Sequence, residues 1–139
     1  MIWGRIVIRP QQQTGTDRQR PPSSAEWCGP RRCPRPDVQP WTETCGQIRC
    51  LIEEKDGATG EVHHVEIHDA KLHYYERTDE FYYVIAGQGT MILDDEEIEL
   101  HAGVVVYVPR GVRHKAKGNL TVLTVCVPRG VLGDVHEVE

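Results

Sequence analysis

The chain has 139 residues, of which 39% are hydrophobic and 27% charged, with a formal net charge of −5 at pH 7. These values are typical of one globular domain and leave no room for a second domain of ordinary size. The longest uncharged apolar stretch, residues 102–109, is far too short to span a bilayer, so no membrane partner is expected. The first ten residues lack the long apolar segment of a secretory signal, which favours a cytoplasmic protein.

Residues 1–40 differ in kind from the rest of the chain. They hold seven arginines and three acidic residues, a net charge of +4, so residues 41–139 carry a net charge of −9. They also hold seven of the nine prolines. Such a segment buries too little apolar surface to offset the entropy of ordering it. We therefore expect residues 1–43 to form an irregular arm. No aromatic residues alternate with its arginines and no binding motif accompanies them, so no nucleic-acid partner is expected.

The five cysteines are odd in number, so at least one thiol is unpaired, and the cytosol would keep all of them reduced. Cys28 and Cys33, followed by Cys45 and Cys50, repeat a four-residue gap that can be interpreted as two halves of a zinc site. Structural zinc usually has closer cysteine pairs, and Cys50 lies in an alternating strand pattern. Free thiols are the preferred interpretation. Cys126 lies in an apolar run and is interpreted as a small buried hydrophobe.

From Thr44 onward the sequence consists of short β-rich segments separated by turn signals. The predicted strands are 47–54, 61–68, 70–76, 80–86, 90–93, 98–100, 104–108, 112–117 and 120–127. Because no helical periodicity of ten or more residues separates them, we predict an all-β barrel or sandwich over residues 44–130. Residues 131–139 are expected to form a short acidic tail.

Successive residues of a strand point to opposite faces, which groups the polar side chains of two of these strands. His73 and Tyr75 point to one face of their strand, and Glu80 shares a face with Tyr82 in the next. The short connection over residues 76–79 allows the two strands to pair, which could bring His73, Tyr75 and Glu80 together.

Two plainer interpretations of the polar residues stay open. Glu80 could form an ion pair with Arg110 or Arg113. His114, which follows a Pro-x-Gly turn, could be a structural turn histidine, because spacing alone does not place it with the others. The remaining candidates for solvated or structural roles are His63, His64, His68 and His101.

The run from Gly103 to His114 resembles the second motif of the cupin superfamily. Gly103 is followed by five residues, Pro109, one residue, Gly111, two residues and His114, although Asn119 stands one place late. Glu80, six residues and Gly87 match the second half of the first cupin motif. The fifteen residues between Gly87 and Gly103 are the spacing seen in small single-domain microbial cupins.

The first half of that motif departs from the family. Its His-x-His pair falls on His73 and Tyr75, and Ile67 stands where a glycine is expected. Cupins use three histidines and one glutamate inside the barrel to bind a metal. The resemblance therefore implies that His73, Glu80 and His114 bind a metal, with Tyr75 at the fourth position. Tyr75 would bind the metal only if a cation lowered its pKa, and otherwise would be a catalytic hydrogen-bond or proton donor.

The resemblance implies a cupin-type double-stranded β-helix, or jelly-roll barrel, that holds a divalent metal ion (Fe, Mn, Ni, Zn or Cu) and a small polar organic ligand. The implied activity is that of a metal-dependent oxygenase, isomerase or lyase. The alternative is a metal-free cupin that binds or senses a small molecule, such as a carbohydrate. Cupins of this size are often homodimers, and the arm could add to a partner's sheet.

Overall fold

The computed structural model describes residues 38–130 and 132–139. These residues form nine strands and a single 3-10 turn, Glu54–Asp56, which confirms the all-β fold class. The strands are β1 (Trp41–Glu43), β2 (Gly46–Ile52), β3 (Glu61–Asp69), β4 (His73–Tyr75), β5 (Asp79–Leu93), β6 (Glu96–His101), β7 (Val105–Val108), β8 (His114–Val127) and β9 (Val135–Glu137). Within these residues no helix is long and apolar enough to cross a membrane.

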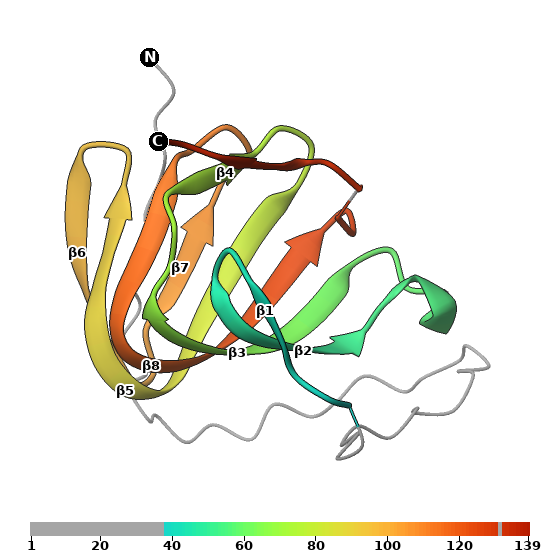
Figure 1. Cartoon of the computed structure of the whole chain (residues 1–139), viewed down its shortest axis with the longest axis horizontal. Coiled ribbons are helices and arrows are strands. Elements are labelled where there is room, and N and C mark those ends of the chain that lie inside the picture. Colours follow the sequence, from blue (N-terminus) through green and yellow to red (C-terminus); the bar gives the residue numbers. More distant parts are fainter. Residues whose placement is uncertain (1–37, 131) are drawn as a thin grey trace, which may run out of the picture.

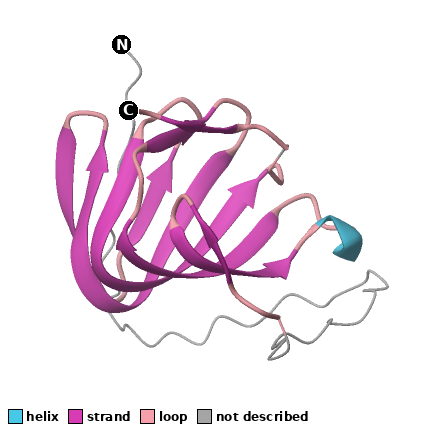
Figure 2. Ribbon diagram, in the orientation of Figure 1, coloured by secondary structure: helices cyan, strands magenta, loops and turns pink. Residues whose placement is uncertain are grey.

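The strands pair in one antiparallel sheet that curls around its own core (Figure 1). One path runs β1-β2-β3-β8-β4-β9, while β5 pairs with β6, β7 and β8. Most of the described chain is strand (Figure 2). The result is a half-open barrel whose concave side encloses the buried side chains.

Two long strands, β5 and β8, replace four of the predicted strands. The sequence suggested turns at residues 87–89 and 118–119, but the chain bends there without leaving the sheet. Gly87 has φ 87° and lies so close to β8 that a Cβ atom would stand 1.9 Å from the carbonyl oxygen of Asn119. Only glycine permits this conformation and approach, so these glycines mark bends in paired strands rather than loops.

The interior of the barrel has an apolar half and a polar half. In the apolar half, Val84, Val122 and Val65 lie side by side across β5, β8 and β3 and are fully buried. Burial of each such side chain contributes roughly 1.5–3 kcal/mol to stability. Further along the same strands, Glu80 lies opposite Cys126. The inward positions thus change from valine to polar residues within one sheet.

The sheet reaches beyond the predicted barrel at both ends. β1 lies within the predicted arm, and β9 lies within the predicted tail, where it pairs with β4 along the open edge of the sheet (Figure 1). Both strands are only three residues long, too short for a sequence pattern to reveal. The arm proper, residues 1–37, lies outside the described residues, and its irregular structure remains a prediction.

Candidate metal centre

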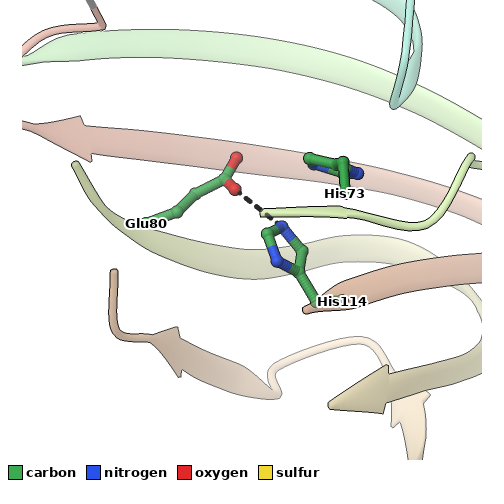
Figure 3. A group of neighbouring side chains, drawn as sticks. All are labelled: His73, Glu80 and His114. Carbon is green, nitrogen blue, oxygen red and sulfur yellow. Dashed lines mark hydrogen bonds and ion pairs between the residues drawn. The ribbon is translucent and has the colours of Figure 1, made fainter. Parts of the chain in front are cut away.

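Three of the predicted site residues meet inside the polar half. His73 comes from β4, Glu80 from β5 and His114 from the start of β8, and one possible ligand atom of each lies within 4.8 Å of the others (Figure 3). All three are buried, with exposed fractions of 0%, 2% and 0%. The two histidines are partners across β4 and β8, with ring centroids 4.2 Å apart.

Backbone carbonyls fix the orientation of both imidazole rings. The Nδ1 of His73 lies 2.7 Å from the carbonyl oxygen of Lys71, and that of His114 lies 3.0 Å from the carbonyl oxygen of Val112. Because a carbonyl oxygen only accepts hydrogen bonds, each Nδ1 carries a proton and each ring turns its Nε2 toward the cluster. This is the arrangement found around metal-binding histidines.

The carboxylate of Glu80 completes the cluster. Its Oε2 lies 3.0 Å from the Nε2 of His114 (Figure 3). A lone pair and a carboxylate oxygen this close repel each other unless a proton or a cation lies between them. Burial and the neighbouring His114 lower the pKa of His73, which favours its neutral, metal-binding form. Two imidazoles and one carboxylate therefore fit a divalent metal ion.

Tyr75 lies beside the cluster. Its ring meets that of His73 edge-on at 5.8 Å between centroids and lies 6.3 Å from that of His114. Burial, and then the negative charge of Glu80, raise the pKa of the Tyr75 phenol far above its usual value. The hydroxyl therefore stays protonated in the absence of a cation and is a hydrogen-bond donor. Its catalytic role remains a prediction.

The alternative ion pair between Glu80 and Arg110 does not form. The Nε of Arg110 lies 3.0 Å from the carboxylate of Asp79 instead, and this contact lowers the pKa of Asp79. Asp79 and Glu80 are neighbours in one strand and point to opposite faces, so only Glu80 reaches the interior. Its partner is His114, and the role of this histidine as a metal ligand remains a prediction.

Cys45 also reaches the cluster, which the sequence did not predict. Its Sγ lies 3.5 Å from the Nε2 of His73 and 4.0 Å from the hydroxyl of Tyr82, and burial raises the pKa of the thiol. The zinc half-site of Cys45 and Cys50 is not supported, because Cys50 hydrogen-bonds instead to the carbonyl of Ile52. Cys28 and Cys33 lie outside the described residues.

A second polar group faces the same interior. His63, expected to be solvated or structural, has its Nδ1 3.4 Å from the hydroxyl of Thr124 and its Nε2 3.7 Å from the carboxylate of Glu61. Burial lowers the pKa of His63. In the sheet register Cys126 lies between Glu61 and Glu80, so all these side chains line one surface. The sequence did contain a signal for the inward position of His63: residues 61, 63 and 65 alternate along one strand, and Val65 is buried.

The family comparison agrees with this geometry. A family model described as "Cupin domain" matches residues 59–127. An uncharacterised protein of Methanocaldococcus jannaschii is 35% identical over 57 residues, which cover 40% of this chain and 46% of that protein. The match thus spans less than half of that relative's length.

Several solved structures share the fold. A protein from Planctomyces limnophilus has a TM-score of 0.72 at 21% identity, with 78% of this chain and 97% of that chain covered. Pac13 from Streptomyces, described as a nucleoside dehydratase, has a TM-score of 0.65 at 18% identity, with 73% of this chain and 85% of that chain covered. Ectoine synthase from P. lautus has a TM-score of 0.59 at 17% identity, covering 73% and 81%. The family match identifies residues 59–127 as a cupin domain, and these structures share its fold.

Proposed function

We propose that this protein is a metal-dependent enzyme that acts on a small polar organic molecule in the polar half of the barrel. A divalent metal would be bound by His73, Glu80 and His114. The observation that carries the proposal is that two imidazoles, each oriented by a backbone carbonyl, and one buried carboxylate place one possible ligand atom each within 4.8 Å of the others. This arrangement is costly without a charge or proton to bind, and a metal ion satisfies all three groups at once.

The surrounding residues favour proton-transfer chemistry over oxygenation. When bound, the metal supplies a Lewis acid that polarises an oxygen of the substrate. The protonated phenol of Tyr75 lies beside the cluster and would donate a proton to a leaving or rearranging group. An isomerase or lyase is therefore the reaction class that we propose.

The charge of the polar half favours a neutral substrate, because the carboxylates of Glu61 and Glu80 would balance the charge of a bound divalent ion. The side chains of this half include the carboxylates of Glu61 and Glu80, the neutral ring of His63 and the hydroxyl of Thr124. Carboxylates accept hydrogen bonds from hydroxyl or amino groups and repel anions. Uridine, present in structures of Streptomyces PAC13, is an uncharged ligand with hydroxyl groups and belongs to the proposed class.

Metal analysis of the full chain tests the proposal. The protein should be purified without chelators or a histidine tag, and its metal content measured by mass spectrometry beside Glu80→Gln and His114→Ala. We expect close to one divalent ion per chain in the wild type and none in either variant. A wild type without bound metal that also fails to take up added Zn²⁺ or Mn²⁺ would contradict the proposal.

A metal-free binding module is the second candidate. It is favoured by the fact that each Nε2 has a partner without a metal: Cys45 beside His73, and Glu80 beside His114. In that case Glu80→Gln would preserve ligand binding, because glutamine still hydrogen-bonds to His114. A metal enzyme would lose both its metal and its activity in this variant.

We also propose a homodimer in the cytosol. The outward side chains of β5 and β7 include several large apolar ones that are exposed, namely Phe81, Tyr83, Ile85 and Val105. An exposed apolar sheet face of this kind is typical of an interaction surface. Light scattering should give twice the chain mass for the wild type and the mass of one chain for Tyr83→Glu. If a chain without residues 1–40 stays dimeric, the predicted role of the arm in the dimer is wrong.

A further inference from the structure

Cys45 occupies an unusual place for a cysteine. It is the second residue of the two-residue turn that joins β1 to β2, and it is nevertheless only 5% exposed. Hairpin turns normally lie at the surface and carry small polar residues. Here the turn folds over the open edge of the barrel, and the thiol points inward to His73.

Several contacts hold this turn in position. The N–H of Lys71 donates to the carbonyl of Thr44 at 3.0 Å, and the hydroxyl of Thr44 donates to the carboxylate of Glu137 at 2.9 Å. Gly46 packs so closely on β3 that a Cβ atom would stand 2.3 Å from the carbonyl oxygen of Glu66. The buried position of Cys45 is thus fixed by its neighbours on both sides.

The distance from Cys45 to His73 is the distance between two ligands of one metal ion. The Sγ atom lies 3.5 Å from Nε2, the nitrogen that carries the lone pair. Bonds of about 2.1 Å from nitrogen and about 2.3 Å from sulfur, at a tetrahedral angle, place the two ligand atoms about 3.6 Å apart. The hydroxyl of Tyr82, 4.0 Å from the same sulfur, is on hand to donate to it.

We propose that Cys45 is a fourth protein ligand of the metal centre, together with His73, Glu80 and His114. In this structure the sulfur is not within 4.8 Å of all three of their ligand atoms, so it would move toward the other two residues as the metal binds. This inference rests on the proposed function, because it presumes that the cluster binds a metal. The thiol proton passes to water as the sulfur binds the cation. Two imidazoles, a carboxylate and a thiolate favour Zn²⁺ or Co²⁺ over the harder Mn²⁺, and zinc can still accept a fifth ligand from the substrate.

Cobalt binding to the full chain tests the inference. Cys28 and Cys33 are replaced by serine in every sample, because their thiols could also bind metal. Co²⁺ bound to a thiolate gives an intense sulfur-to-cobalt charge-transfer band in the near ultraviolet. We expect this band in the reference protein, its loss in Cys45→Ala and its retention in Cys126→Ala. Cys126 is the matched control, since it is an equally buried thiol of the same interior.

The affinity for zinc provides a second measurement. Competition with a chromophoric chelator should show that Zn²⁺ binds at least about tenfold more weakly to Cys45→Ala than to Cys126→Ala. X-ray absorption of the zinc-loaded reference protein requires no variant at Cys45. It should show one sulfur at about 2.3 Å beside nitrogen and oxygen at about 2.0–2.1 Å.

The outcomes separate this inference from the proposed function. If Co²⁺ and Zn²⁺ bind and require His114, but no sulfur is found, Cys45 is not a ligand and the metal enzyme still stands. If the reference protein binds neither ion, both proposals are overturned. A charge-transfer band that survives in Cys45→Ala but not in Cys126→Ala would assign the sulfur ligand to Cys126 and overturn the inference.

Discussion

The two sides of the candidate metal centre are built differently. Glu80 lies in β5 and His114 is the first residue of β8. These two strands pair along almost their whole length in the middle of the sheet. His73 and Tyr75 belong to β4, which pairs with β8 at a single position and otherwise with β9. One side of the site therefore lies in the middle of the sheet, whereas the other lies on a short strand next to β9, the strand at the edge.

The chain end compensates for the weak pairing of β4. The carboxylate of Asp134 accepts hydrogen bonds from the N–H groups of Glu76 and Arg77, at 3.1 and 3.2 Å. At the other end, the N–H of Val138 donates to the carbonyl of Leu72 at 2.9 Å. Residues 134–138 thus form a strap that lies along β4. We therefore expect global stability to depend mainly on β5 and β8, and metal affinity to depend also on β4 and the C-terminal residues that hold it.

The largest effect is expected on the side in the middle of the sheet, for His114→Ala. The substitution removes a ligand and leaves the buried carboxylate of Glu80 without its partner. We expect complete loss of metal binding and a decrease of about 3–5 kcal/mol in the free energy of unfolding, measured by urea denaturation. His101→Ala, an exposed histidine of the same sheet, should change the free energy by less than about 0.5 kcal/mol. Equal effects of the two variants would refute the assignment.

Removal of the strap should separate affinity from stability. In a chain that ends at Gly133, β4 loses β9 and the carboxylate of Asp134, but β5 and β8 keep their pairing. We expect metal affinity to fall about 10–100-fold, by competition titration, while the protein still unfolds cooperatively. A chain that lacks only Glu139 serves as the control. Unchanged affinity in the shorter chain would show that β4 positions His73 without the strap.

Tyr75→Phe should leave the metal in place. If the phenol donates a proton and is not a ligand, the variant should bind Zn²⁺ within about twofold of the wild type. It should also lower turnover of a cognate substrate by roughly 10²–10⁴-fold. The control is Tyr74→Phe, since Tyr74 stacks on His136 at the edge instead. Loss of zinc binding in Tyr75→Phe alone would make the tyrosine a ligand.

The smallest effect concerns His63 and pH. Burial lowers the pKa of His63 in the folded protein below its unfolded value of about 6.5. Below pH 6.5 the unfolded chain takes up a proton more readily than the folded one. The stability associated with neutral His63 is therefore complete above that pH and is lost as the pH falls. His63→Gln should reduce this loss, by less than about 1.4 kcal/mol per pH unit in unfolding experiments. The exposed His68→Gln should not change the slope.

Local patterns predicted some features and missed others for identifiable reasons. Alternation correctly placed Glu80 and Tyr82 on one inward face, because a strand repeats every two residues. Glycines at 87 and 118 suggested turns, because the same residue serves a loop and a close approach of two strands. The C-terminal strand has no pattern of its own, since three residues gain their structure only from β4.

The sequence by itself determined the fold class, the family and the three metal-binding candidates, because these depend on strand period and on motif spacing within short segments. The tertiary structure alone decided which side chains share a space. It placed Cys45 beside His73, which is 28 residues further along the chain, and paired β4 with the C-terminal strand β9. Such contacts depend on how the sheet curls and on which edge each short segment can reach, and no local pattern encodes either.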